Sequence, residues 1–192
     1  MKKILIPLFI FIVGFLYSQT IDNTVYIQPL GDVSDVSLTI VKNSIEKFYG
    51  HKCVVRPKIP FSDDLLAKSK TRYNASKILK KFDSNKNLLI ITESDIAKKH
   101  RGFDEYGILG LGYISGNTCV VSTFRMKRKV SKEKFHDRLT KVSIHEVGHN
   151  LGLDHCEYDR KCLMNDARGT VKQIDRERVW LCDNCRKNIG MK

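Results

Sequence analysis

Residues 145–155 read HEVGHNLGLDH, and the expected fold and chemistry of the chain follow from this motif. His145 and His149 are one helical turn apart, so a helix presents both imidazoles on one face, where they can bind one ion. Gly152 tolerates the positive φ at which a helix ends, and the turn there lets His155 return as a third ligand. Three protein ligands leave the fourth position of a tetrahedral zinc ion for water.

Glu146 follows the first histidine and is the candidate general base. Bound zinc lowers the pKa of water, and Glu146 would take the water proton during attack on a peptide carbonyl and pass it to the leaving amine. The alternative is a surface helix that carries histidines by chance. We disfavour it because the added glycine and third histidine at fixed offsets are far more demanding than a bare HExxH.

Four cysteines accompany this stretch and suggest a second metal site. They are Cys156, Cys162, Cys182 and Cys185. Two cysteines separated by two residues form half of a zinc site, and the first two can form the other half. Four thiolates would make a closed, structural site that pins the C-terminal segment. Two disulfides are the alternative in an exported protein, whereas a redox pair is disfavoured because no thioredoxin-like context surrounds it.

The rest of the chain alternates between strand and helix patterns. Strands are expected at 24–30, 52–59, 87–92, 108–115 and 118–126, and helices at 34–49, 73–82, 131–151 and 171–192. Ser131 is the expected N-cap of the long helix, Gly116-Asn117 favours a tight hairpin turn, and residues 93–107 are interpreted as a long loop. This order predicts a mixed, mostly parallel sheet with helices packed on it. Cys53 and Cys119 lie on different expected strands and are interpreted as unpaired buried hydrophobes.

The N-terminus has the pattern of a secretory signal peptide over residues 1–18. Lys2 and Lys3 precede an apolar run that ends in a polar Ser18-Gln19-Thr20, and this run is short for a membrane span. An uncleaved anchor is the alternative. The pattern predicts a secreted or periplasmic protein with no membrane span in the mature chain.

The net charge is +13, and removal of the two lysines with residues 1–18 leaves +11. Apart from residues 127–129 the basic residues are scattered, which favours a solvated surface over a nucleic-acid interface. No nucleic-acid partner is therefore expected. The length of 192 residues predicts one domain over 19–192, with lobes at 19–152 and 153–192. We expect a monomer.

The motifs resemble those of the archaemetzincins, a branch of the metzincin zinc peptidases. The family pattern is HExxHxxGxxHC, a short gap, CxM, seventeen residues and CxxC. Here it reads HEVGHNLGLDHC, EYDRK, CLM, seventeen residues and CDNC. The gap of five residues between Cys156 and Cys162 is one longer than the family usually has.

The resemblance implies an α+β fold, α/β-like, with a twisted mixed five-stranded sheet and an antiparallel edge strand. It implies two zinc ions per chain: a catalytic ion on the three histidines with Glu146 as base, and a structural ion on the four cysteines that pins a small C-terminal lobe. Met164 would be the Met-turn residue beneath the catalytic zinc. Strand 108–115 would lie above the zinc and bind substrate through Gly110, Leu111, Gly112 and Tyr113. On this basis Leu111→Pro is expected to raise KM.

These observations predict a secreted zinc metallopeptidase that acts on a peptide or protein substrate. The small size suggests an open cleft, and aminopeptidase action on short peptides is one option. The alternative is a zinc-stabilised peptide- or protein-binding module of the same fold with little turnover. Glu146 argues against that alternative, because a binding module needs no general base.

Overall fold

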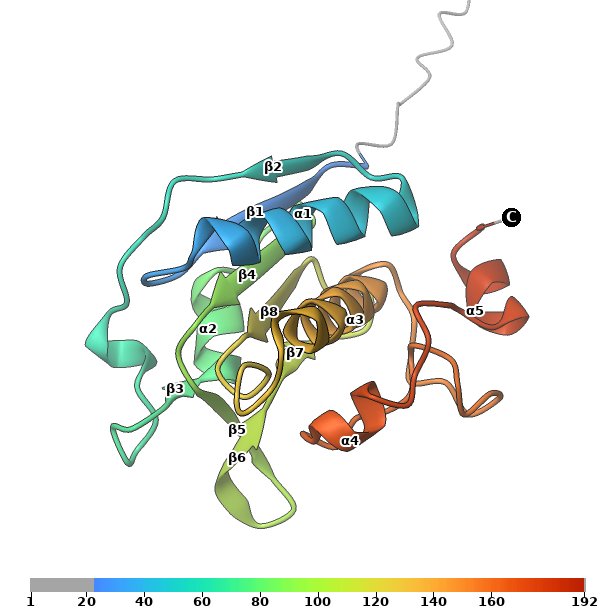
Figure 1. The fold of residues 1–192 in the computed structure, drawn as a ribbon. Coiled ribbons are helices and arrows are strands. Elements are labelled where there is room, and N and C mark those ends of the chain that lie inside the picture. Colours follow the sequence, from blue (N-terminus) through green and yellow to red (C-terminus); the bar gives the residue numbers. More distant parts are fainter. Residues whose placement is uncertain (1–22, 192) are drawn as a thin grey trace, which may run out of the picture.

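A five-stranded sheet forms the centre of the computed structural model, which describes residues 23–191 (Figure 1). Its strand order is β2-β1-β4-β8-β7. The strands are β1 (Val25–Pro29), β2 (Cys53–Val55), β4 (Leu88–Thr92), β7 (Gly110–Gly112) and β8 (Thr118–Ser122). The first four in spatial order are parallel, and β7 pairs antiparallel with β8 at the edge. This confirms the expected mixed sheet with an antiparallel edge strand.

Helices cover both faces of the sheet, so its central strands are buried on each side. Every residue of β4 and β8 is buried. Alternate strand residues pack on one face against α1 (Asp35–Tyr49) and α3 (Lys132–Asn150), and on the other against α2 (Ala75–Lys81) (Figure 1). Continuous apolar runs such as LLIIT are the pattern of strands buried in this way.

The long helix α3 begins where the sequence predicts. The Ser131 hydroxyl accepts a hydrogen bond from the backbone N–H of Lys134 at 3.3 Å, which satisfies a donor of the first turn. The helix packs its apolar residues on α1, on the edge strand β7 and on its neighbour β8. It therefore holds its C-terminal half against the edge of the sheet.

Residues 93–107 are not a long loop, and that prediction is wrong. They form a hairpin of β5 (Ile96–His100) and β6 (Phe103–Ile108), and β5 also pairs with the short β3 (Tyr73–Asn74). Its two-residue turn has positive φ at both Arg101 (45°) and Gly102 (84°), as a type I′ turn needs. An arginine at the first position and mostly polar strand residues concealed this hairpin in the sequence.

Two further local predictions are wrong. Residues 113–117 form a loop between β7 and β8 instead of a tight turn at Gly116-Asn117, because the Ser115 N–H donates to the His149 carbonyl at 3.0 Å and ties the loop to α3. The expected helix over 171–192 is two short helices, α4 (Val171–Ile174) and α5 (Asp183–Asn188). The segment between them pairs with an earlier one, since the Leu163 N–H donates to the Trp180 carbonyl at 2.9 Å.

The interpreted signal peptide over residues 1–18 lies outside the described residues. Among the helices of residues 23–191, none combines the length and the apolar character needed to cross a membrane. Cys53 on β2 and Cys119 on β8 are both unpaired and buried, and β1 and β4 separate their strands.

Candidate active site

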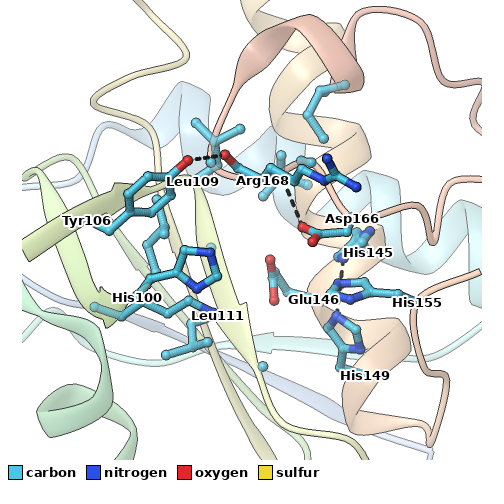
Figure 2. A pocket seen from close by; sticks show the side chains of 18 residues that line it. His100, Tyr106, Leu109, Leu111, His145, Glu146, His149, His155, Asp166 and Arg168 are labelled. Atoms are coloured by element: carbon cyan, nitrogen blue, oxygen red, sulfur yellow. Dashed lines mark hydrogen bonds between the residues drawn. The ribbon is translucent and has the colours of Figure 1, made fainter. Parts of the chain in front are cut away.

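The three histidines of the motif converge at the end of α3. His145 and His149 lie one turn apart on the helix, and the chain reverses at Gly152 with φ +97° so that His155 turns back toward them (Figure 2). One nitrogen from each ring lies within 4.8 Å of the others. His145 and His149 are buried, whereas His155 is exposed at the mouth of the site.

The hydrogen bonds of the two buried rings fix where their protons lie. The Nδ1 atoms of His145 and His149 each lie 2.7 Å from a backbone carbonyl, that of Leu163 and of Leu153 respectively. A carbonyl only accepts, so both Nδ1 atoms carry the proton and both Nε2 atoms carry a lone pair. Burial lowers the pKa of both rings, for His145 to about 3, so both are neutral.

The two Nε2 atoms nevertheless face each other at 3.1 Å. Two lone pairs at that distance repel, and this contact becomes favourable when a cation accepts both. Neutral imidazoles whose Nδ1–H is held by a carbonyl are the usual form of histidine zinc ligands. The donor set of the three histidines thus fits zinc.

Glu146 lies against the edge strand. Its Oε1 would be 2.4 Å from a Cβ added at Gly110, so glycine there makes room for the carboxylate. Burial raises the pKa of Glu146 to about 8, and the positive charge of Lys98 opposes that rise. Figure 2 shows the carboxylate beside the histidines and directed into the cavity. A carboxyl group with a pKa near neutrality can both accept and release a proton.

Met164 packs under α3, against the part of the helix that carries His145 and His149. It is fully buried, and its Sδ would be 2.7 Å from a Cβ added at Gly148. Its carbonyl accepts the Cys156 N–H at 2.8 Å, which ties the segment after His155 to residue 164. The methionine singled out in the sequence therefore lies against α3 between His145 and His149.

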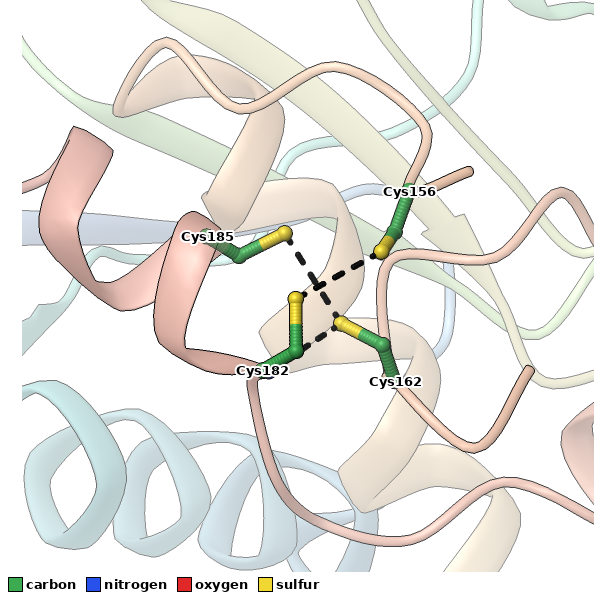
Figure 3. Close-up of side chains that lie close together, drawn as sticks. All are labelled: Cys156, Cys162, Cys182 and Cys185. Atoms are coloured by element: carbon green, nitrogen blue, oxygen red, sulfur yellow. Dashed lines mark hydrogen bonds between the residues drawn. The ribbon is translucent and has the colours of Figure 1, made fainter. Parts of the chain in front are cut away.

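The four cysteines form a second cluster beside the first. Figure 3 shows their sulfurs turned toward a common centre, and all four lie within 4.8 Å of one another. The Sγ–Sγ distance is 3.6 Å for Cys156 and Cys182, and 3.8 Å for Cys162 and Cys185. A tetrahedron with Zn–S bonds of about 2.3 Å has edges of about 3.8 Å, whereas a disulfide needs about 2.05 Å. The geometry fits zinc, and all four thiols are free.

A cavity of about 280 Å³ opens over the three histidines and Glu146. Gly110, Leu111 and Gly112 line it from β7, whereas Tyr113 lies beyond the end of the strand with its hydroxyl 3.4 Å from that of Ser76. The Ser122 N–H donates to the Leu109 carbonyl, so the alternation of an antiparallel ladder turns the backbone of Leu111 toward β8. The outward-facing backbone groups of β7 therefore belong to Gly110 and Gly112. Because the backbone of Leu111 faces β8, Leu111→Pro would break the β7–β8 ladder and would not test substrate contacts.

Several cavity residues were absent from the sequence prediction. They are Lys98, His100 and Tyr106 of the β5–β6 hairpin, and Asp166 and Arg168 of the segment after Met164. The Tyr106 hydroxyl donates to the Arg168 carbonyl at 2.5 Å, which joins the hairpin to that segment over the cavity (Figure 2). The Arg101-Gly102 turn was the only sequence signal for the three hairpin residues, and Asp166 and Arg168 lie on irregular chain for which the sequence carried no signal.

Comparisons with known proteins agree with this geometry. The family model described as Peptidase family M54 matches residues 32–191. The archaemetzincin of Archaeoglobus fulgidus is 32% identical over 165 residues, which cover 86% of this chain and 98% of that protein. The archaemetzincin of Halobacterium salinarum is 30% identical over 174 residues, which cover 85% of this chain and 97% of that protein.

Solved structures show the same fold. A crystal structure of the archaemetzincin from Archaeoglobus fulgidus, complexed with malonate, has a TM-score of 0.76 and 31% identity, and the match covers 86% of this chain and 99% of that chain. A zinc-dependent peptidase from Methanocorpusculum labreanum has a TM-score of 0.74 at 20% identity, with 86% and 99% covered, and this likeness concerns the fold alone.

Proposed function

Because the chain belongs to peptidase family M54, the archaemetzincins, and is therefore a zinc metallopeptidase, we propose that it hydrolyses peptide bonds with Glu146 as the general base. In this proposal His145, His149 and His155 hold the catalytic zinc. The observation that carries the ligand assignment is the 3.1 Å contact between two Nε2 lone pairs, which a shared cation makes favourable.

The side chains of this site divide the reaction between them. When bound, zinc supplies a Lewis acid that activates water and polarises a carbonyl. Glu146 accepts the proton of the attacking water and delivers it to the nitrogen of the leaving amine. The outward-facing backbone groups of Gly110 and Gly112 orient the substrate beside β7.

We assign a second, structural zinc ion to Cys156, Cys162, Cys182 and Cys185. The Sγ–Sγ distances of 3.6 and 3.8 Å support this assignment over two disulfides. The chain would then be one catalytic domain over 19–192 in which the second ion stabilises the lobe of residues 153–192. Met164 would act as the Met-turn residue beneath the catalytic ion, and we expect a monomer.

The test is digestion of a mixed peptide library by zinc-loaded mature protein, read by mass spectrometry. Glu146→Ala removes the base, and Asp63→Ala, which removes an exposed carboxylate of the 3-10 helix Asp63–Leu65, is the matched control. We expect products with the wild type and with Asp63→Ala and none with Glu146→Ala. Equal products from Glu146→Ala would contradict the assignment of the base.

The same product list decides the mode of cleavage. Loss of single N-terminal residues from short peptides would establish aminopeptidase action, and internal fragments would exclude it as the sole mode. An absence of products, with two zinc ions measured per chain, would favour the alternative of a peptide-binding module with little turnover.

We also propose that the protein is exported to the periplasm or the cell exterior. The basic start, apolar run and polar cleavage zone of residues 1–18 support this proposal. Cell fractionation and N-terminal sequencing of the native protein test it. A protein recovered in the cytoplasm with its N-terminus intact would contradict it.

A further inference from the structure

A second, larger pocket adjoins the catalytic cavity. It has a volume of about 710 Å³ and lies on the segment after α3. His155, Asp166, Ala167 and Arg168 line both pockets, so the two are contiguous at the candidate ligand His155. A substrate that leaves the catalytic cavity on this side enters the second pocket within a few residues of the scissile bond.

The charges of this second pocket are unbalanced. Its basic side chains are those of Arg160, Arg168, Lys172 and Arg176, and we call this set the basic pocket. Its acidic side chains are Glu157 and Asp166, and Asp166 accepts the backbone N–H of Arg168 at 2.8 Å. Charges that line one concave surface reinforce each other and attract anions.

The four cations of the basic pocket also lack carboxylate partners among the described residues. Within residues 23–191, none of them has a carboxylate oxygen within 4.0 Å, whereas the neighbouring Lys134 and Arg138 both pair with Asp175. Some cations elsewhere on the surface are also paired, as Lys127 is with Glu93 and Lys81 with Asp64. The pocket is therefore a place where positive charge gathers without neutralisation.

The wall between the two pockets is held in a strained backbone conformation. Arg168 has φ +48°, which is uncommon for a residue with a Cβ, and Gly169 follows with φ +68°. The Tyr106 hydroxyl holds the Arg168 carbonyl, and a Cβ on Gly169 would be 2.7 Å from the Gly107 carbonyl oxygen. Strain of this kind persists where surrounding contacts enforce it, and it is common at binding sites.

We propose that the basic pocket binds a carboxylate of the substrate, so that this peptidase prefers acidic peptides. The proposal rests on the peptidase function above and adds a substrate class to it. Two sources offer the same chemistry: an acidic side chain near the scissile bond, or the free C-terminal carboxylate of a short peptide. The attraction is between exposed charges and therefore weakens as salt is added.

The test compares matched peptides that differ by one carboxylate. One pair carries Glu or Gln beyond the cleaved bond, and a second pair has a free or an amidated C-terminus. We expect a kcat/KM about tenfold higher for the acidic member of at least one pair at low ionic strength, and a smaller ratio at high salt. The pair that shows the effect identifies the source of the carboxylate.

A triple variant links the preference to the basic pocket. Arg160→Gln, Lys172→Gln and Arg176→Gln together remove three exposed charges whose side chains make no hydrogen bond in the described structure. The matched control is Lys47→Gln, Lys52→Gln and Lys80→Gln, which removes the same charge from exposed positions outside both pockets. We expect the acid-to-amide ratio to fall toward one in the first triple variant and to stay at the wild-type value in the control.

Binding provides a readout that does not depend on turnover. Fluorescent versions of the same peptides are titrated onto the Glu146→Ala protein, with and without the pocket substitutions. Equal affinity for acidic and amide peptides at low salt, or a preference that survives the triple variant, would overturn the proposal. Glu146-dependent cleavage of both peptides at equal rates would refute the proposed role of the basic pocket alone. An absence of Glu146-dependent cleavage of any peptide would refute the proposed peptidase mechanism.

Discussion

Two regions build this site, and different forces hold them. The region up to residue 150 presents His145, Glu146 and His149 on a helix. A large apolar cluster joins this helix to the sheet. Residues 153–191 supply His155, Met164 and the cysteines from irregular chain with two short helices. Of the nine buried residues in the apolar cluster around this second region, one is Ile144 of α3, and four of the other eight are cysteines.

This difference predicts that the second region depends on metal and that the first does not. Burial is the main force that holds a sheet with apolar residues on both faces, whereas a short segment in which cysteines are half of the buried cluster residues has little other apolar surface to bury. The catalytic site lies on the boundary, because His155 belongs to the second region. We infer that two of the proposed zinc ligands, His145 and His149, stay in place without the structural ion, whereas the position of His155 depends on it.

The largest expected effect is the loss of the second region in Cys182→Ser. On the order of 10 kcal/mol of folding free energy is coupled to structural zinc in small metal-dependent domains. We expect zinc content to fall from two ions to one or none, and hydrogen exchange to become fast over residues 153–191 while β1, β4 and β8 stay protected. Mass spectrometry of exchanged peptides and of metal content measures both.

Cys53→Ala is the matched control for that variant. Cys53 is a buried thiol on β2, outside the cysteine cluster, so its loss should lower stability by a core-packing amount of about 1 kcal/mol and leave metal content unchanged. If Cys182→Ser retains two zinc ions and residues 153–191 stay protected from exchange, the assignment of a structural ion is refuted.

Gly110→Ala tests the contact between the two sides of the catalytic cavity. The added Cβ would lie 2.4 Å from Glu146 Oε1, so the carboxylate must move by about 1 Å. Displacement of a catalytic group by that amount costs about 100-fold in rate, and we expect that loss in kcat with folding retained.

Gly50→Ala is the control for the glycine substitution. Its φ of +70° strains an alanine, a cost that Gly110 does not share because its φ is not positive, but a Cβ at Gly50 meets nothing within 4 Å among the described residues. It should lower stability by about 1 kcal/mol and leave kcat unchanged. If Gly110→Ala retains the full wild-type kcat, the carboxylate does not need its observed position.

The same contrast explains what the sequence could predict. Residues 145–155 predict the three histidines because their spacing is local, and the apolar runs predict the sheet because burial on both faces has a pattern. Lys98 and Arg168 escaped prediction, because the first depends on a hairpin with a polar sequence and the second on a turn in irregular chain. Residues 171–192 were mistaken for a helix because local propensity does not encode the pairing of Leu163 with Trp180.

Glu177 gives the second region a dependence on pH. Its carboxylate is buried, and neither oxygen has a hydrogen-bond partner among the described residues. Burial raises its pKa to about 7, and the positive charge of Lys141 opposes the rise. The folded state therefore holds this proton more tightly than the unfolded state. The stabilisation is complete below about pH 4.5 and is lost as the pH rises through 7, by up to about 3 kcal/mol.

Glu177→Gln removes that titration. We expect its free energy of unfolding to exceed that of the wild type at pH 8 by about 1–3 kcal/mol, and the two to converge below pH 5. Urea denaturation across this pH range measures the difference. Parallel curves for the two proteins at every pH would show that Glu177 is not the group responsible.

The smallest expected effect concerns the first region, at the start of the helix that carries the site. Ser131→Ala removes the hydroxyl that accepts the Lys134 N–H, which should cost about 1 kcal/mol and lower Tm by about 3 °C. Ser143→Ala, the same substitution within that helix, removes a buried hydroxyl that has no hydrogen-bond partner in residues 23–191 and should be neutral or stabilising. The first region is held by its own packing, so Ser131→Ala should leave zinc content at the wild-type value. A loss of zinc from this variant would mean that both regions depend on metal and that the contrast between them does not hold.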